Sequence, residues 1–309
     1  MTALASRASG GAARHRGAGH VALPLLVTAL SAAGVVAIHR VFIRTITGQA
    51  VDTGALNGAE VHHPRVVEVL SRTLNGTTLA GLVLVCLAAA AVGVLRRRVD
   101  VAVAAAVLVA GANLTTQLLK TSLHRPNLDG LPAPNSFPSG HTTAAASVAF
   151  ALVLALPYAI RGMVALIGAA YVTVIAVATV WAEWHRPSDT VAGLLIVLAW
   201  GGLVTAVLRA HRLRVPGPAG RPSRLTTVLF TVVCTVTAAA GLLGLGAVVL
   251  SERGVGGDLV SGRFAFLTGA ACITAAVAGT FLIWVRLAAG DQPVTPPAVP
   301  VRADATGDR

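Results

Sequence analysis

The stretch that decides the fold is 138–189, which reads PSGHTTAAASVAFALVLALPYAIRGMVALIGAAYVTVIAVATVWAEWHRPSD. Polar and ionisable residues stand at both of its ends, and between them lie two apolar runs near 142–160 and 163–182. Two helices of about 20 residues carry a chain across a bilayer and back to the same face. We therefore expect His141 and His185 to meet at one membrane face, although 44 positions separate them.

The remainder of the chain has the same apolar character. Of 309 residues, 55% are apolar and 12% are charged, whereas about 25% are charged in an ordinary soluble domain. Runs of about 18 or more apolar residues qualify as membrane-spanning helices. The sequence contains eight, near 21–39, 78–95, 101–119, 142–160, 163–182, 190–208, 225–250 and 264–285. We predict an all-α, polytopic membrane helix bundle.

The net charge of +12 reflects membrane topology in this interpretation. Arginines cluster before the first span, after the second and after the sixth, and eight spans place these segments on one side. The positive-inside rule makes that side cytoplasmic, where arginines contact anionic headgroups. We therefore expect no nucleic-acid partner, a cell-membrane location, and the turns at 121–141 and 183–189 on the extracytoplasmic side.

Composition divides the chain into five expected segments. The tails at 1–20, on the cytoplasmic side, and at 290–309 are rich in Gly, Ala, Pro and Arg and are expected to be disordered. A six-helix catalytic core is expected at 21–210, followed by a basic cytoplasmic loop at 211–224. The last two spans are expected to form an accessory transmembrane hairpin at 225–289.

Ionisable side chains at membrane depth are energetically expensive, so they are candidates for function. Lys120 and Arg125, near the end of the third span, offer cationic donors suited to phosphate oxygens. Ser139 and Gly140 immediately precede the fourth span. Their backbone N–H groups are therefore expected at a helix N-terminus, which is an anion site.

A histidine and a carboxylate stand one helical turn apart at the start of the sixth span. Asp189 follows His185 at the i, i+4 spacing. A carboxylate there accepts from one ring nitrogen, fixes the tautomer and leaves the other nitrogen free for attack. His141 then remains as the proton donor for the leaving oxygen. Together these residues indicate phosphoryl transfer through a covalent phosphohistidine, with no metal or other cofactor.

These motifs resemble those of the type 2 phosphatidic acid phosphatase (PAP2) superfamily, and the resemblance covers 21–210. The family has a Lys, six residues and Arg-Pro; then Pro-Ser-Gly-His; then Ser-Arg, five residues, His, three residues and Asp. Here the matching residues are Lys120 with Arg125-Pro126, Pro138-Ser139-Gly140-His141, and His185-Arg186-Pro187-Ser188-Asp189. The resemblance implies a PAP2-like six-helix core followed by two extra C-terminal helices.

By this resemblance, His185 would be the nucleophile, Asp189 its orienting partner and His141 the general acid. The phosphate would be held by Lys120, Arg125, Ser139 and Gly140. Substrates would be lipid phosphates or diphosphates, such as phosphatidate, phosphatidylglycerol phosphate or a polyprenyl diphosphate. The enzyme would be metal-independent and would work among membrane lipids.

Two positions depart from the family pattern. Four residues rather than six separate Lys120 from Arg125, and Pro126 disfavours helical geometry in the segment before it. Ala178 and Thr179 stand where the family has Ser-Arg. Either Arg186 supplies the missing charge, or Thr179 donates one hydrogen bond.

Two other functions remain open at this point. The missing motif-three arginine favours a non-catalytic protein that binds or transports a lipid phosphate. A phosphotransferase would use the same histidine to pass phosphate to a hydroxyl group. The long outer loop at 45–77 contains His62 and His63 without further ligands, so we expect no metal site there. We expect the loops at 45–77 and 127–137 to select the headgroup.

Overall fold

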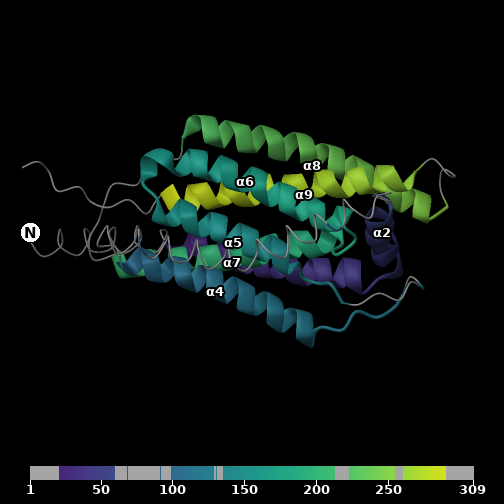
Figure 1. Ribbon diagram of the computed structural model, residues 1–309, viewed down its shortest axis with the longest axis horizontal. Coiled ribbons are helices and arrows are strands. Elements are labelled where there is room, and N and C mark those ends of the chain that lie inside the picture. The colour runs from purple at the N-terminus through teal and green to yellow at the C-terminus, as the bar shows by residue number, and fades with distance from the viewer. Residues whose placement is uncertain are drawn as a thin grey trace, which may run out of the picture.

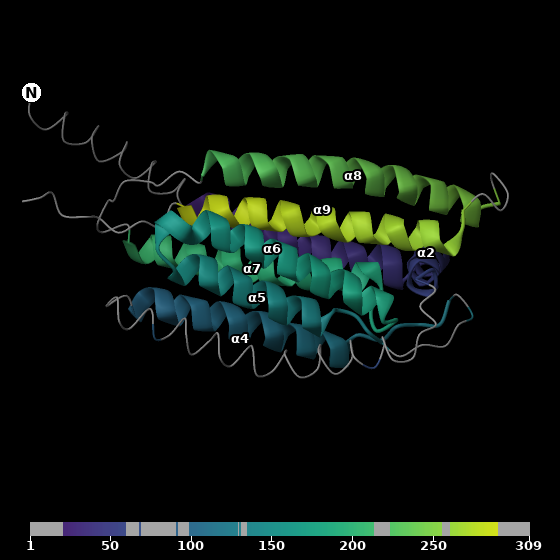
Figure 2. The same ribbon diagram turned by 45° about the horizontal axis from the view of Figure 1, so that its top comes forward.

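A computed structural model describes 21–59, 68, 91, 99–128, 130, 135–212, 223–254 and 260–289. Within these residues the chain forms helices and no strand. The helices are a first helix, Val21–Ile43, ending in η1 (His39–Ile43), and then α2 (Ile46–Asn57), α4 (Val99–Ser122), α5 (Gly140–Ala155), α6 (Tyr158–Trp181), α7 (Pro187–Arg212), α8 (Arg224–Glu252) and α9 (Gly262–Ala289). In Figures 1 and 2 the long helices lie along one axis, and α2 lies across one end. The all-α bundle is confirmed.

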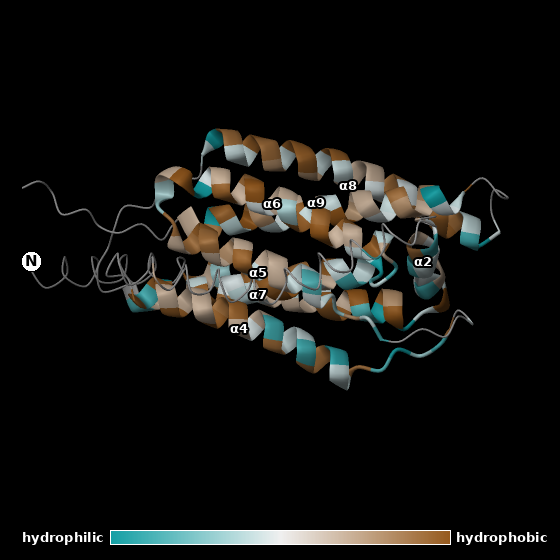
Figure 3. Cartoon of the chain, in the orientation of Figure 1, coloured by the Kyte–Doolittle hydropathy of each residue, from teal (hydrophilic) through white to brown (hydrophobic). Residues whose placement is uncertain are grey.

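Six of the described helices are long and apolar enough to cross a membrane. Apolar side chains also cover their outward faces: Leu242 and Leu243 of α8 are 67% and 77% exposed. Figure 3 shows apolar colour along the helices and hydrophilic colour at the last turns of α4. Such a surface is stable against lipid rather than water, so the chain is a multi-pass membrane protein. The predicted span at 78–95 falls largely on residues outside the described ones.

The boundary between the fourth and fifth predicted spans was wrong. The sequence predicted a span near 142–160, but α5 ends at Ala155 and α6 begins at Tyr158. Pro157 takes the N-cap position of α6, and Leu156 before it is extended. Proline interrupts a helix and disfavours helical geometry in the preceding residue. The resulting α5 has 16 residues, a length of about 24 Å.

Aromatic side chains join α5 and α9 in one core. The rings of Phe150 and Trp284 stack with centroids 4.7 Å apart, and the Trp284 indole N–H donates to the Phe150 carbonyl at 3.2 Å. Phe281 meets Phe150 edge-on at 5.1 Å. The helix α9 therefore packs inside the bundle, although the sequence placed it in an accessory hairpin. The domain boundaries stay predictions.

Glycines bring α8 close to α9. A Cβ atom added to Gly241 would lie 2.7 Å from Cys272 Sγ, and one added to Gly244 would lie 2.4 Å from Thr268 Oγ1. Gly246 has no such neighbour within 4 Å. Small residues at a helix interface allow this close approach in a membrane.

The helix α2 corrects the interpretation of 45–77 as a loop. Thr45 caps it, because its Oγ1 accepts from Gly48 N at 3.0 Å. The helix buries Gln49, Asp52 and Thr53 as well as apolar residues. With 12 residues, it is too short to give the apolar run that marks a membrane span.

Candidate active site

Polar residues from four parts of the chain gather at the end of the bundle where α2 lies, which we call the α2 end. These parts are the segment after α4, the start of α5, the turn between α6 and α7, and α2 itself (Figure 1). The N-termini of α5 and α7 both lie here. Helix N-termini carry partial positive charge and favour anions.

The structure brings the two predicted histidines together. The ring centroids of His141 and His185 are 5.9 Å apart, with the rings at 64° to one another. His185 is buried, and His141 is half-buried against Trp184, with ring centroids 5.4 Å apart. Their convergence follows from the helical hairpin of α5 and α6. Their catalytic roles stay predictions.

Asp189 lies behind His185 but does not hydrogen-bond to it. His185 Nδ1 is 3.7 Å from Asp189 Oδ2. That oxygen accepts from Ser136 Oγ at 2.6 Å and from Arg186 N at 2.9 Å. Catalytic hydrogen bonds are often long without substrate and tighten when it binds. Asp189 therefore lies near His185 and fixes the turn that carries it, and its role as orienting partner stays a prediction.

The turn between α6 and α7 is held by backbone bonds. The N–H groups of Trp184 and His185 donate to the Thr179 carbonyl at 3.0 and 3.1 Å. Glu183 reverses the chain with a positive φ of 59°, an uncommon conformation for a residue other than glycine. Pro187 then starts α7, a position at which its missing N–H costs nothing.

The start of α5 differs in one detail from the predicted anion site. Ser139 is the N-cap of α5, and its Oγ accepts from Thr142 N at 3.3 Å. Its own backbone N–H donates to the Asp189 carbonyl at 2.9 Å. The prediction that this N–H faces a phosphate was therefore wrong. Gly140, in the first turn of α5, still offers an N–H without an intrahelical acceptor.

The predicted cations Lys120 and Arg125 lie at the same end. Lys120 is half-buried in the last turn of α4 and interacts electrostatically with His141. Helix α4 ends at Ser122, so the chain leaves helical geometry before Pro126, as predicted. Arg125 is buried and interacts electrostatically with Asp52.

Side chains on both sides hold the segment that carries Arg125. Gln49 Nε2 donates to the Pro126 carbonyl at 2.7 Å, and Gln49 Oε1 accepts from Leu128 N at 3.1 Å. Asn135 Nδ2 donates to the Leu123 carbonyl at 2.8 Å. The backbone around Arg125 is therefore fixed by α2 on one side and by the segment before α5 on the other.

The two candidates for the missing motif-three charge lie in different surroundings. Thr179 is fully buried, and its hydroxyl donates to the Ala176 carbonyl at 2.9 Å within α6. Arg186 is buried with its guanidinium on two hydroxyls: Nε is 3.2 Å from Thr53 Oγ1, and Nη1 is 3.4 Å from Ser136 Oγ. The geometry therefore favours Arg186 as the source of charge.

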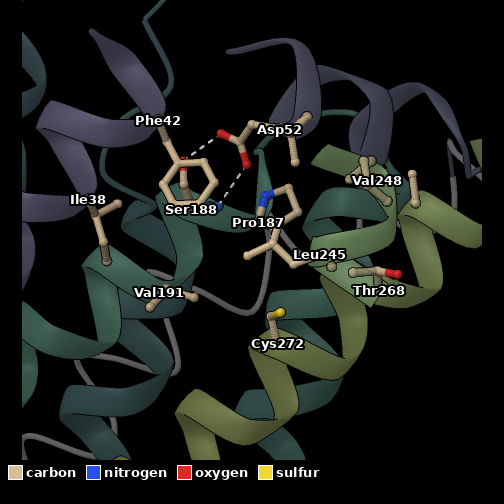
Figure 4. A pocket seen from close by; sticks show the side chains of 14 residues that line it. Ile38, Phe42, Asp52, Pro187, Ser188, Val191, Leu245, Val248, Thr268 and Cys272 are labelled. Carbon is tan, nitrogen blue, oxygen red and sulfur yellow. Dashed lines mark hydrogen bonds between the residues drawn. The ribbon is translucent and has the colours of Figure 1, made fainter. Parts of the chain in front are cut away.

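Sequence reasoning missed Asp52, Thr53 and Ser136. Asp52 Oδ1 accepts from Ser188 N at 3.1 Å, and Asp52 Oδ2 accepts from Ser188 Oγ at 2.5 Å (Figure 4). Burial, followed by repulsion from Asp189, raises the pKa of Asp52 to about 7. A local signal that could have found it is an acidic residue between two predicted spans.

Metal ligands are sparse in the part of the chain that the structure describes. It contains no group of three His, Cys, Asp or Glu side chains placed to hold an ion. His62 and His63 lie outside that part.

A family model described as the PAP2 superfamily matches residues 78–213. Comparisons with curated proteins and with solved structures give no match. The matched stretch contains Lys120, Arg125, the α5 motif and the His185–Asp189 motif, whereas the first helix, α2, α8 and α9 lie outside it. The superfamily consists of phosphatases that act on phosphate esters. Residues 78–213 of the chain are therefore similar to the PAP2 superfamily.

Proposed function

We propose that the protein is a phosphatase for lipid phosphates or lipid diphosphates that works at the extracytoplasmic membrane face. The observation that carries this proposal is the contact of the His141 and His185 rings, with centroids 5.9 Å apart, where the N-termini of α5 and α7 meet. Two histidines at converging helix N-termini supply a nucleophile, an acid and an anion site in one place.

In the proposed reaction, His185 Nε2 attacks phosphorus in line with the bond to the lipid oxygen. That phosphorus–oxygen bond breaks as His141 transfers its proton to the leaving oxygen. His141 then takes a proton from a water molecule, which attacks the phosphohistidine. The nitrogen–phosphorus bond breaks, inorganic phosphate leaves and His185 is restored. Asp189, 3.7 Å from His185 Nδ1, stabilises the positive charge on the imidazole.

Charge at the α2 end supports phosphate binding. Lys120 lies in the last turn of α4, and Arg125 follows the end of that helix. The Gly140 N–H lies in the first turn of α5. Cations and N–H groups placed where negative charge develops stabilise a phosphoryl-transfer transition state without moving. Arg186 adds a fixed charge behind the His185 turn.

The apolar bundle supports a lipid substrate. A phosphate on a lipid lies at headgroup depth, which is where the ends of membrane-spanning helices lie. A water-soluble phosphate ester does not need a site in this position. Helix α7 begins at the α2 end and runs into the arginine-rich stretch 209–224, so the positive-inside rule supports an extracytoplasmic site.

Phosphate release from purified protein tests the activity. Phosphatidate, phosphatidylglycerol phosphate and a polyprenyl diphosphate would be compared with a soluble sugar phosphate, each with a His185→Ala control. We expect release from lipid substrates by wild type and none by the variant. Equal release by both proteins, or preference for the sugar phosphate, would contradict the proposal. Transfer of phosphate to an added hydroxyl compound would indicate a phosphotransferase.

The membrane side is tested separately by cysteine labelling. Cysteines replacing Asn135 and Arg212 lie at opposite ends of the bundle. An impermeant maleimide added to intact cells should label the first and not the second. The reverse pattern would place the site on the cytoplasmic side.

A non-catalytic lipid-phosphate-binding protein is the second candidate. The observation that favours it is Thr179, which stands at the family's arginine position and uses its hydroxyl within its own helix. Saturable binding of a lipid phosphate without any phosphate release would support this function.

A further inference from the structure

The turn that carries His185 is held by two helices outside the family match. Residues 186–188 lie against α2 through Asp52 and Thr53, and against α9 through Gly269. We call Asp52, Thr53 and Gly269 the α2–α9 support. None of these three residues lies in 78–213.

Asp52 is the polar centre of the support. It is 2% exposed, and its two carboxylate oxygens accept from the backbone N–H and the hydroxyl of Ser188. Ser188 lies in the first turn of α7, one residue before Asp189. A carboxylate that accepts an N–H at a helix N-terminus satisfies an orphan donor and complements the helix dipole. Asp52 therefore fixes the start of α7 from another helix.

Thr53, the next residue in α2, bonds the guanidinium of Arg186 at 3.2 Å. Adjacent residues of α2 thus hold both polar residues that flank Pro187. The hydrogen bonds of Asp52 and Thr53 therefore hold both ends of the tripeptide 186–188.

Helix α9 packs closely against Pro187 at Gly269. A Cβ atom added to Gly269 would lie 2.7 Å from Pro187 Cγ. At the other end of α2, a Cβ on Gly58 would lie 1.8 Å from the Gly262 carbonyl oxygen. Val51 and Ala55 of α2 also share an apolar cluster with Val248 and Ala265. The position of α2 is therefore set by α8 and α9.

A cavity of about 210 Å³ lies beneath the Asp52–Ser188 bonds, lined by residues from η1, α2, α7, α8 and α9 together with Ile38 (Figure 4). Asp52 and Ser188 both line this cavity, and their hydrogen bonds join α2 to the start of α7 there.

We propose that α2 and α9 position His185 for attack, with Asp52 as the positioning residue of this support. The proposal assigns the last two helices a role in the reaction, since they hold α2 in place. Its catalytic part rests on the proposed phosphatase activity.

The first test replaces Asp52 by Asn, which keeps the shape but replaces one of the two oxygens that accept from Ser188 by an amide NH₂ donor. Glu252→Gln is the matched control, because it makes the same change at an exposed site at the end of α8. We expect Asp52→Asn to lower kcat by about 10- to 100-fold, because small displacements of a reacting group carry penalties of this order. KM should stay within about threefold, since Asp52 acts on the proposed phosphate site only through its electrostatic interaction with Arg125. The control should keep both constants.

The second test enlarges Gly269. Gly269→Ala pushes against Pro187, whereas Gly246→Ala on α8 meets no neighbouring atom. Gly269→Ala should lower kcat in the same way as Asp52→Asn, and Gly246→Ala should not. This pair keeps the proposal testable if the Asp52 variant fails to fold.

A chemical readout separates this proposal from the phosphatase proposal. Diethyl pyrocarbonate modifies exposed histidines, and mass spectrometry follows the peptide that contains His185. Asp52→Asn and Gly269→Ala should both speed modification of the buried His185 at least about threefold, because loosened backbone exposes it more often. The controls should not.

If wild type releases no phosphate, the phosphatase proposal fails and the modification rates alone decide whether the support exists. If wild type is active, a folded Asp52→Asn protein with kcat within about twofold of wild type overturns the positioning role. Unchanged modification rates in both variants overturn it as well.

Discussion

Buried arginines lie at both ends of the bundle, and Arg161 and Arg186 are held in different ways. Arg161, at the end opposite α2, donates to the backbone carbonyls of Leu154, Leu156 and Ala288 at 2.9 to 3.0 Å. These carbonyls lie at the C-termini of α5 and α9. Arg186, at the α2 end, lies on the hydroxyls of Thr53 and Ser136 and close to Asp189.

The difference distinguishes an arginine that joins helix ends, Arg161, from one that we propose acts on phosphate, Arg186. Carbonyls at helix C-termini carry partial negative charge and are satisfied by a cation, so Arg161 joins the ends of α5 and α9. At the α2 end α5 and α7 present their N-termini, which attract anions. We propose that the cations and histidines there bind a phosphate. If this distinction holds, chemistry is confined to the α2 end.

The largest expected effect distinguishes His185, just before α7, from His211, near the end of α7. His185 precedes the helix at the α2 end, and His211 lies exposed in its last turn. His185→Gln should lower kcat by about 1,000-fold or more, because it removes the proposed nucleophile. His211→Gln should leave kcat unchanged. Steady-state phosphate release measures both, and comparable losses in the two variants would break the comparison.

The two buried arginines give the next effect. Arg186→Ala should lower kcat by about 30- to 1,000-fold, as expected for a charge that acts on a developing anion. Arg161→Ala should instead lower the melting temperature, because it leaves helix-terminal carbonyls without their donor. The folded fraction should keep its kcat. A stable Arg186→Ala protein with near wild-type kcat would remove Arg186 from the site.

Asp52 makes stability depend on pH at the α2 end. Burial, and then Asp189, raise its pKa from 3.8 to about 7. Asp189 faces it from α7 and Arg125 from the segment after α4, and Arg186 bonds the adjacent Thr53. Helices α8 and α9 present Val248 and Ala265 to the same region. The folded protein therefore keeps a proton that the unfolded chain has lost at intermediate pH.

Because the pKa is raised on folding, the stability that this proton gives is present below pH 4 and is lost as pH rises through about 7. Asp52→Asn has no such proton to lose. Its melting temperature minus that of wild type should rise by on the order of a few degrees between pH 4 and 8. Differential scanning calorimetry at several pH values measures this difference. A constant difference across the range would show that Asp52 is not protonated in the folded protein near neutral pH.

The smallest expected effect is that of chelation. Mg²⁺ prefers carboxylate and water oxygens, and the proposed mechanism uses imidazole, ammonium and guanidinium groups instead. EDTA should therefore change kcat by less than about twofold, and vanadate should inhibit as a mimic of the five-coordinate phosphorus. Loss of activity in EDTA that Mg²⁺ restores would contradict the proposed reaction.

Residues with strong local signals were predictable. Apolar length predicted the membrane-spanning helices, and the hairpin between His141 and His185 predicted their meeting. The end of α4 before Pro126 followed from the geometry of a residue before proline. These features depend on neighbours in sequence, so a single chain reveals them.

The rest depends on contacts between distant segments. Asp52 and Ser188 are 136 positions apart, and nothing in either local sequence shows that they pair. The Ser139 N–H was assigned to a phosphate because its acceptor, the Asp189 carbonyl, comes from another helix. Pro157 did carry a local signal, and the apolar run around it was given more weight than the proline.

The central claim is that phosphate becomes bonded to His185. His141→Gln protein, in which breakdown of the intermediate should be slow, would be mixed with ³²P-labelled phosphatidate, quenched in alkali and digested. We predict a phosphohistidine on the peptide that contains His185, and none when His185→Gln is added. Phosphate release by wild type without label on His185 in any variant would contradict the account.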